Sequence, residues 1–350
     1  MKQLQLSFLL IGCLFVSDIS AQIGGTEIFE FLNLPASARV SGLAGSAIAV
    51  LDDDINLSLE NPALINPTNH KQITFNHSFH LAGIDHGYAA FGYHHKASEI
   101  SFNGGIQYIS YGDFVQADEF GNATGEFNAN EFGINIGASK QVFDRLRVGA
   151  NLKLITSQLE SYNSLGLAAD LGAHYQDTSG RTTFGLVIKN VGTQLTTFRE
   201  DNREDLPFDI QFGITKRLKH LPFRIGLTIH NLHRGNIVFD DPNAVEPTSL
   251  FGNEEIGENE VGLFVDNLFR HTIFNGEFLL GKKENFNIRF GYNHFRRREL
   301  TVSTASRSLS GFSLGFGFKV KRFKISYGHQ FYAIAGGNNH LGITTKLGRW

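Results

Sequence analysis

The sequence predicts an all-β protein: a 14-stranded antiparallel transmembrane β-barrel with an N-terminal plug or hatch. Three observations predict this fold. Apolar and polar residues alternate with a period of two in many segments, glycine (38 residues) and phenylalanine (32 residues) are abundant, and long connections alternate with short ones. A period of two gives each strand one apolar and one polar face.

Residues 1–21 have the pattern of a cleavable secretory signal peptide. Lys2 precedes an apolar stretch from Leu4 to Val16, which is followed by the small residues Ser17, Ser20 and Ala21. A helix needs about 20 apolar residues to cross a bilayer, so this stretch is too short for a permanent anchor. We expect export and cleavage after Ala21. Leu10 to Cys13 also resembles a lipobox, so lipidation of Cys13 is the alternative.

Charge and hydropathy exclude two classes of protein. Charged residues make up 19% of the chain and the net charge is −3, so the chain lacks the basic surface that nucleic-acid binding requires. The mean hydropathy is −0.13, and there is no run of eighteen apolar residues, which argues against transmembrane helices. Only a β-barrel is then left to span a bilayer.

Residues 22–70 lack long alternation and contain three prolines, at positions 35, 62 and 67. We therefore expect a folded plug or hatch there rather than further strands. An acidic run within it is consistent with a turn cap or a salt bridge in the barrel lumen, and the spacing of an EF-hand calcium loop is missing. The plug residues of interest are Arg39, Asp52, Asp53, Asp54, Asn61, Pro62 and Ala63.

Residues 71–350 are expected to form the barrel. Each predicted strand has about nine to thirteen residues, which suits a tilted membrane strand and exceeds the five or six that are usual in a soluble β-sandwich, the alternative fold. The predicted strands are 71–81, 87–96, 99–111, 130–141, 145–156, 164–175, 182–190, 208–217, 222–232, 270–281, 285–295, 310–320, 322–332 and 338–348.

The lengths of the connections predict the orientation of the barrel. The long ones, 112–129, 191–207, 233–269 and 296–309, all follow odd-numbered strands, whereas connections after even-numbered strands are short, as at Lys321. Outer-membrane barrels have long loops at the cell surface and short turns in the periplasm. The four long connections are therefore assigned to the cell surface.

Two of these outer loops carry charged residues that we select as candidate docking sites for a partner. Acidic side chains in 233–269 suit a basic patch on a partner, and the arginines at the start of 296–309 suit lipopolysaccharide or a partner carboxylate. Solvated loops are the alternative for both. The candidates are Asp240, Asp241, Glu254, Glu255, Glu258, Arg296, Arg297 and Arg298.

We expect no catalytic residues, no metal and no cofactor. His77 and His80 point to opposite faces of one strand, as do the adjacent His94 and His95, whereas a zinc site needs three or four converging ligands. No phosphate-binding glycine loop precedes a helix. The prediction is a protein that is not an enzyme.

Several motifs resemble the PorV/PorQ family of Bacteroidetes outer-membrane proteins, which are relatives of the FadL fatty-acid channel. The resemblance covers most of the chain after the signal peptide. The matching motifs are Leu34–Arg39, Gly42–Gly45, Asp52–Asp54, Asn61–Ala63, Asp118–Asn122, Thr124–Phe127, Gly166–Gly172 and Leu206–Phe208.

The resemblance implies a FadL-like barrel in the type IX secretion system. Its implied partners are a PorZ-like surface protein and, through it, a PorU-like sortase and a PorV-like barrel. Such an attachment complex links exported cargo to anionic lipopolysaccharide in the outer membrane. On this interpretation the barrel is an anchor, and the outer loops are its docking surface.

Two other functions stay open: a FadL-like channel for hydrophobic solutes with a movable hatch, and a PorV-like cargo shuttle. A fatty-acid pocket is expected to be apolar, and the predicted inward faces are polar, which favours the anchor. The inward polar residues are Asp209, Gln211, Arg224, His230, Arg289 and Lys319.

Overall fold

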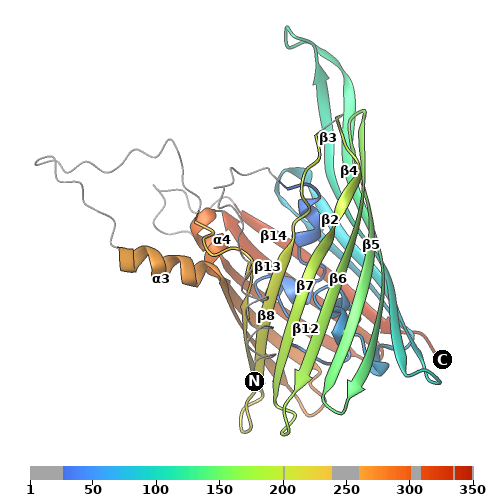
Figure 1. The fold of residues 1–350 in the computed structure, drawn as a ribbon, viewed down its shortest axis with the longest axis vertical. Helices are drawn as coiled ribbons and strands as arrows, with labels where there is room; N and C mark the ends of the chain where they lie inside the picture. Colours follow the sequence, from blue (N-terminus) through green and yellow to red (C-terminus); the bar gives the residue numbers. More distant parts are fainter. Residues whose placement is uncertain (1–26, 200–201, 239–259, 301–308, 334–335, 349–350) are drawn as a thin grey trace, which may run out of the picture. The chain divides into compact units, whose positions relative to one another are not determined.

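The computed structural model describes residues 27–199, 202–238, 260–300, 309–333 and 336–348. Fourteen antiparallel strands follow one another around a closed barrel, and β1 pairs with β14 to complete it (Figure 1). The 14-stranded barrel expected from the sequence is confirmed. The strands are β1 (Gln72–Phe79), β2 (Asp85–His95), β3 (Ile100–Ala117), β4 (Ala123–Phe143), β5 (Leu146–Leu159), β6 (Tyr162–Gln176), β7 (Thr182–Thr196), β8 (Asp209–Arg217), β9 (Phe223–Ile229), β10 (Thr272–Leu280), β11 (Phe286–Asn293), β12 (Phe312–Val320), β13 (Phe323–Ala333) and β14 (Gly336–Lys346).

Side chains alternate between the two faces of the wall. On β12, Leu314 and Phe316 are about half exposed on the outside, whereas Ser313, the residue before Leu314, is buried in the lumen. Ser313 donates a hydrogen bond to the carbonyl of Gly42, a residue inside the barrel. An apolar outer face and a polar inner face are what a bilayer-spanning barrel requires.

We call residues 27–71 the plug, and most of them lie inside the barrel (Figure 1). The plug begins beside the outer connections, where the amide of Ile28 donates to the carbonyl of Asp205. It ends just before Gln72, the first residue of β1, which pairs with Lys346 at the other end of the wall. Its helices are short. They are η1 (Glu30–Asn33), α2 (Ala38–Gly42), η2 (Ile55–Ser58), η3 (Pro62–Leu64) and η4 (Pro67–Asn69).

The plug has apolar clusters of its own. One is formed within the plug by Val40, Leu43, Ala47, Val50, Leu57 and Leu64, which are all buried. Another joins Phe29 and Phe31 to wall residues such as Ile155. Short turns rather than strands form here because prolines and capping asparagines start new turns every few residues, as at Asn61 and Asn66.

The prediction that 112–129 is a loop is wrong, because β3 and β4 continue through most of it. Phe114 pairs with Phe127, and their rings stack with centroids 5.2 Å apart. Asp118 closes the hairpin by accepting hydrogen bonds from the amides of Phe120 and Asn122. Both faces of this extension are exposed, so no apolar alternation marks it as strand.

Four other connections also contain regular structure. Strand β7 continues to Thr196, into the connection predicted to start at residue 191, and α3 (Glu260–Arg270) occupies the end of the 233–269 connection. Strand β11 ends at Asn293, earlier than the predicted 295, because the Asn293 side chain caps α4 (His294–Glu299). The short η5 (Leu81–Gly83) joins β1 to β2.

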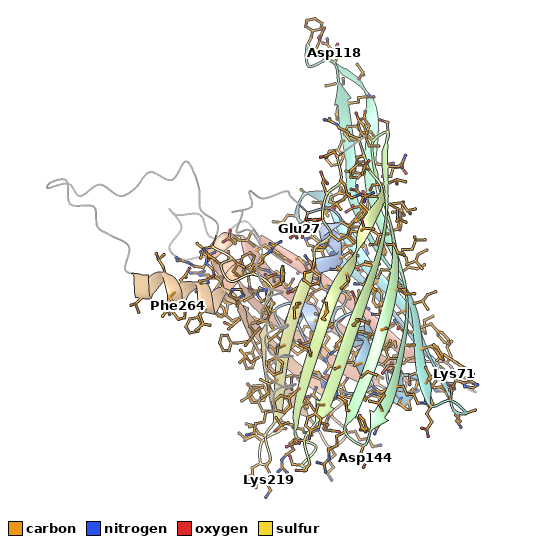
Figure 2. All side chains as sticks on the ribbon, viewed as in Figure 1. Glu27, Lys71, Asp118, Asp144, Lys219 and Phe264 are labelled. Atoms are coloured by element: carbon orange, nitrogen blue, oxygen red, sulfur yellow. The ribbon has the colours of Figure 1, made fainter. Side chains whose placement is uncertain are left out.

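The two ends of the barrel differ as the connection lengths predict. Figure 2 places Asp118, between β3 and β4, at the opposite end from Asp144 and Lys219, which lie in short turns after β4 and β8. No helix in the described part of the chain is both long and apolar enough to span a membrane.

Candidate functional site: the plug and wall interface

The central contact between plug and wall is built around Arg39 in α2. The helix starts at Ser37, whose hydroxyl accepts a hydrogen bond from the amide of Val40, as N-cap serines do. This start places Arg39 in the first turn of the helix. The Arg39 side chain is buried, so its charge needs partners.

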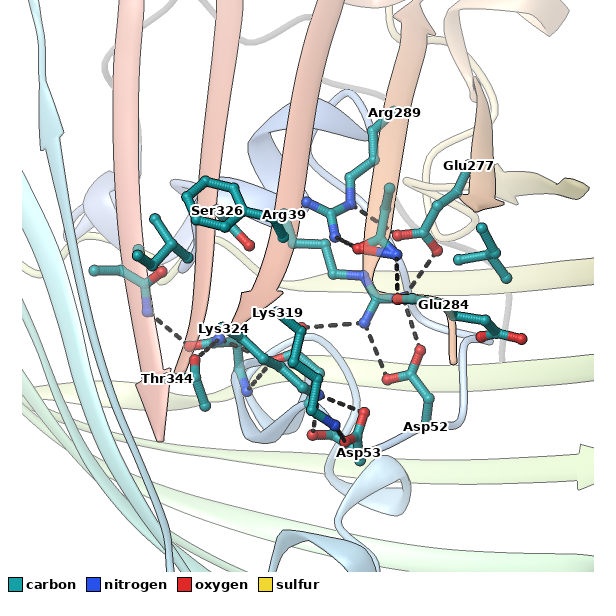
Figure 3. Close-up of a pocket in the computed structure, with 18 of the residues that line it drawn as sticks. Arg39, Asp52, Asp53, Glu277, Glu284, Arg289, Lys319, Lys324, Ser326 and Thr344 are labelled. Carbon is teal, nitrogen blue, oxygen red and sulfur yellow. Dashed lines mark hydrogen bonds and ion pairs between the residues drawn. The ribbon is translucent and has the colours of Figure 1, made fainter. Parts of the chain in front are cut away.

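Arg39 has three carboxylate partners (Figure 3). Its two terminal nitrogens donate to both oxygens of Asp52, at 3.0 and 2.7 Å, in a bidentate pair. Nη1 also donates to Asp54, at 3.1 Å, and Nη2 donates to Glu277 of β10, at 2.9 Å. The planar guanidinium suits such multiple contacts, which a lysine does not reproduce.

Glu277 receives further arginines from the neighbouring strands. In the barrel register it lies opposite Arg224 of β9 and opposite Arg289 of β11. Arg289 Nε donates to Glu277 at 2.7 Å, and Arg224 Nη1 donates to both Glu277 and Asp52, each at 3.1 Å. Because lumen-facing residues on adjacent strands lie side by side, the register itself forms this row.

The network is balanced in charge. Three arginines, Arg39, Arg224 and Arg289, meet three carboxylates, Asp52, Asp54 and Glu277. Burial by itself raises the pKa of Asp52, but the ion pairs with Arg39 and Arg224 outweigh burial and hold that pKa well below its usual value. The carboxylate therefore stays ionised in the closed barrel.

The other two aspartates of the acidic run have different roles. Asp54 caps η2 by accepting from the amide of Asn56 at 3.1 Å. Asp53 pairs with Lys324 of β13, and Lys319 of β12 lies 3.9 Å away. The run thus contacts the wall at β9 through Asp52 and at β12 and β13 through Asp53, and it forms a turn cap and salt bridges.

Asn61, Pro62 and Ala63 form a second contact, on the opposite strands β5 and β6. The Asn61 amide group donates to the carbonyls of Ile48 and of Ala173 in β6, at 2.9 and 3.2 Å. The carbonyl of Ala63 accepts from Arg147 Nε at 3.3 Å, and Arg147 Nη2 donates to the carbonyl of Ile65 at 2.7 Å. Asn61 and Ala63 are completely buried.

Glycines of the wall allow the plug backbone to approach closely. A Cβ atom at Gly185 of β7 would lie 2.3 Å from the carbonyl oxygen of Ile48, and one at Gly328 of β13 would lie 2.2 Å from the carbonyl oxygen of Ala38. Neither distance is possible without a shift of the plug backbone. Glycine is thus required at these positions by the plug, not by the strand.

A polar cavity of about 160 Å³ borders the ion network. Since one water occupies about 30 Å³ of liquid, the cavity has room for a few waters. Its lining is mostly charged, which suits water or small ions rather than an apolar solute. Besides the network residues, its lining includes Asp53, Asn76, Glu284, Lys319, Lys324 and Ser326.

The outer-loop candidates are only partly described. Arg296 does not face outward: its guanidinium lies 4.8 Å from the ring centre of Tyr332, and it would lie 3.4 Å from a Cβ at Gly45 of the plug. Arg298 Nε donates to Asp266 of α3 at 2.9 Å. Arg297 lies in α4 between them. Asp240, Asp241, Glu254, Glu255 and Glu258 lie outside the described residues.

Glu277 was not selected from the sequence, although three arginines converge on it. It lies on the inward face of β10, two residues before Leu279 on the same face. A charged residue at an inward position of a predicted strand is the signal in the sequence that points to it. A second buried pair was also missed: Lys153 of β5 lies 2.8 Å from Asp170 of β6. The contacts of Glu277 and the Lys153–Asp170 pair both depend on which strands are neighbours, and the alternation in the sequence does not predict this.

Comparisons with known proteins identify the fold. No family model matches the chain, and no curated protein matches it. Among solved structures it is similar to the toluene transporter TodX of Pseudomonas putida, with a TM-score of 0.54 and 12% identity over 91% of this chain and 100% of that chain. It is also similar to CymD, a monoaromatic hydrocarbon channel, with a TM-score of 0.52 and 12% identity over 91% of this chain and 99% of that chain.

These neighbours establish a fold and nothing finer. A FadL homologue of Pseudomonas aeruginosa also matches, with a TM-score of 0.46 and 11% identity over 89% of this chain and 95% of that chain. TodX and CymD show that the chain has the fold of these transport barrels, which is consistent with the FadL-like barrel expected from the sequence. At this level of identity the neighbours do not identify a substrate or a partner for this chain.

Proposed function

We propose that this chain is an outer-membrane barrel that is closed by its own plug and anchors a surface protein, as a PorQ-like component of the type IX secretion system. The observation that carries the proposal is the way in which the plug is held. Arg39 is joined to Glu277 on one side of the lumen, and Asn61 is joined to Ala173 on another. A hatch that moves during transport needs contacts that are readily broken, whereas a buried charge network is costly to open.

The polar lumen supports the same function. Asp209, His230 and Arg289 are buried inside the barrel, and the cavity beside the network has a charged lining. An anchor needs a stable wall and an accessible outer rim, and it does not need an apolar path. Most of the motifs that resemble the PorV/PorQ family lie in the plug and in the outer connections, and Gly166–Gly172 lies in strand β6.

The proposed partner is a PorZ-like surface protein, with a PorU-like sortase and a PorV-like barrel joined through it, beside anionic lipopolysaccharide. The acidic connection that contains Asp240, Asp241, Glu254, Glu255 and Glu258 is the proposed docking segment. Its charge suits a basic surface on the partner.

Affinity purification from detergent-solubilised outer membrane, followed by mass spectrometry, tests the anchor. We expect the surface protein and the sortase to co-purify with the intact chain, and to be lost when residues 240–258 are deleted while the barrel stays folded. A chain that purifies alone contradicts the proposal. Retention of the partner after the deletion moves the docking site elsewhere on the rim.

The second candidate is a channel for hydrophobic solutes. The fold favours it, because TodX is a toluene transporter and CymD is a monoaromatic hydrocarbon channel. Planar-bilayer recordings separate the two functions. The anchor predicts a silent intact barrel and a conducting barrel once residues 27–66 are removed, whereas a channel predicts solute uptake by the intact barrel and a stoichiometric bound lipophile.

A further inference from the structure

The outer connection before β10 ends in an amphipathic helix that has no assigned role. Helix α3 spans Glu260–Arg270 and projects away from the barrel wall (Figure 1). Four of its apolar side chains follow the helical spacing i, i+3, i+4 and i+7, which places them on one face. They are Val261, Phe264, Val265 and Leu268, with exposed fractions of 69%, 68%, 43% and 53%.

The polar side of α3 is already occupied. Asp266 accepts from Arg270 within the helix at 2.8 Å and from His294 and Arg298 of α4 at 3.0 and 2.9 Å. Arg270 also pairs with Glu299 of α4. These bonds fix the rotation of α3 about its axis, so that its apolar face is directed away from α4.

The helix joins the wall at the level of an aromatic girdle. Phe269 of α3 packs near Phe274, an outward residue of β10, with ring centroids 6.4 Å apart. On the next strands Tyr292 lies opposite Phe274, and its ring is 4.8 Å from that of Phe312. Aromatic residues gather in this way where a membrane barrel crosses the lipid headgroups.

We propose that α3 is an interfacial helix that lies on the outer leaflet, with Val261, Phe264, Val265 and Leu268 inserted among the lipid acyl chains. The occupant of the apolar face is lipid because that face continues the lipid-facing surface of the wall through Phe269 and Phe274. Helices that lie in a membrane surface have an exposed apolar face, an opposite polar face and a position at the level of the lipid headgroups. Helix α3 has all three, and its polar face is bound to α4. The helix extends the lipid contact of the barrel sideways.

Tryptophan fluorescence tests the proposal, because the chain has a single tryptophan, Trp350. Phe264→Trp is made in a Trp350→Phe background and inserted into nanodiscs of phosphatidylcholine, with or without brominated acyl chains. Two control variants calibrate the response. Phe316→Trp reports the lipid-facing wall, where Phe316 is 42% exposed, and Phe120→Trp reports water, since Phe120 is 81% exposed at the tip of the β3–β4 hairpin.

We expect brominated lipid to quench Phe264→Trp to the same extent as Phe316→Trp, and aqueous iodide to quench only Phe120→Trp. The same measurement on Leu268→Trp, on the same face of α3, covers the case in which the first variant disturbs the helix. Quenching of both α3 variants by iodide but not by brominated lipid overturns the proposal. If neither brominated lipid nor iodide quenches the two α3 variants, the proposal is also overturned, because protein then covers the face.

Discussion

Arg39 of the plug and Glu277 of strand β10 are joined by an ion pair of 2.9 Å, although 238 positions separate them in the sequence. Both side chains are almost completely buried, and the pair lies between Asp52 on the plug side and Arg224 and Arg289 on the wall side. The plug is therefore held to the wall by the most desolvated charges of this region. The buried charge of each residue in the network is compensated only while its partners stay in place.

Replacement of Glu277 by glutamine is expected to loosen the plug. Removal of one partner from a buried ion pair costs about 3–5 kcal/mol, because the remaining charges stay buried without compensation. A cysteine at Ser58, a plug residue with 1% exposure, reports the loosening through its labelling by a maleimide in a Cys13→Ala background. If the plug opens locally, about 3 kcal/mol corresponds to roughly a hundredfold faster labelling.

Glu284→Gln is the matched control for this experiment. Glu284 pairs with Arg217, and both side chains are partly exposed, so loss of that pair is worth at most about 1 kcal/mol. Equal labelling rates in the Glu277 and Glu284 variants would show that the network does not hold the plug.

Replacement of Gly328 by valine is expected to displace α2 from the wall. The new Cβ would lie 2.2 Å from the carbonyl oxygen of Ala38 and 3.0 Å from the amide nitrogen of Gly42, so the plug backbone must shift. Overpacking of a well-packed interior typically costs about 1–3 kcal/mol. The same labelling at Ser58→Cys should accelerate, and planar-bilayer recordings should show openings that the parent barrel lacks.

Gly104→Val provides the comparison, because a Cβ at Gly104 of β3 meets no atom within 4 Å. It adds the same side chain to a strand without contact with the plug. Slow labelling in the Gly328 variant would mean that the plug adjusts to the wall without leaving it.

Replacement of Phe316 by arginine tests the outward face of β12. Phe316 belongs to the apolar outer surface, and arginine on the lipid face of a barrel costs about 2–4 kcal/mol at the midplane of the bilayer. Denaturant unfolding in phosphatidylcholine vesicles should show a loss of this size. Phe120→Arg, at the exposed tip of a hairpin, should leave the stability unchanged, and a similar result for Phe316→Arg would contradict its position in the lipid.

The sequence predicts the barrel well because every membrane strand obeys the same physical constraint. One face meets lipid and the other meets the lumen, so alternation marks all fourteen strands, and 310–320 differs from β12 (Phe312–Val320) by two residues at one end only. Segments that do not lie between lipid and lumen are not subject to this constraint, and there the prediction of secondary structure fails. The extension of β3 and β4 past Phe114 is exposed on both faces, and α3 lies in a connection that was predicted as a loop.

The ion network is harder to predict than the strands. The sequence marks Arg39 and the acidic run as unusual polar residues in the plug, and it marks Arg224 and Arg289 as lumen residues. It does not show that the three arginines meet at Glu277, because that depends on the register of β10 with two neighbours. Alternation fixes the face of a residue, whereas its height along the lumen comes only from the paired strands.

Replacement of Asn61 by alanine is expected to weaken the second plug contact while the ion network stays intact. The Asn61 side chain donates to the carbonyls of Ile48 and Ala173, and its own oxygen accepts from the amide of Ala63. Alanine leaves these buried groups without partners, at a cost of about 1–3 kcal/mol. Labelling at Ser58→Cys should therefore accelerate less than in the Glu277 variant.

Asn163→Ala, at an exposed position of β6, is the control and should match the parent. If the two contacts act independently, their contributions to the free energy of plug opening are additive. The Asn61→Ala, Glu277→Gln double variant should then show the sum of the changes in the two single variants. A double variant that opens no further than Glu277→Gln would mean that release of Arg39 already frees the whole plug, and that Asn61 only shapes the turn at Pro62.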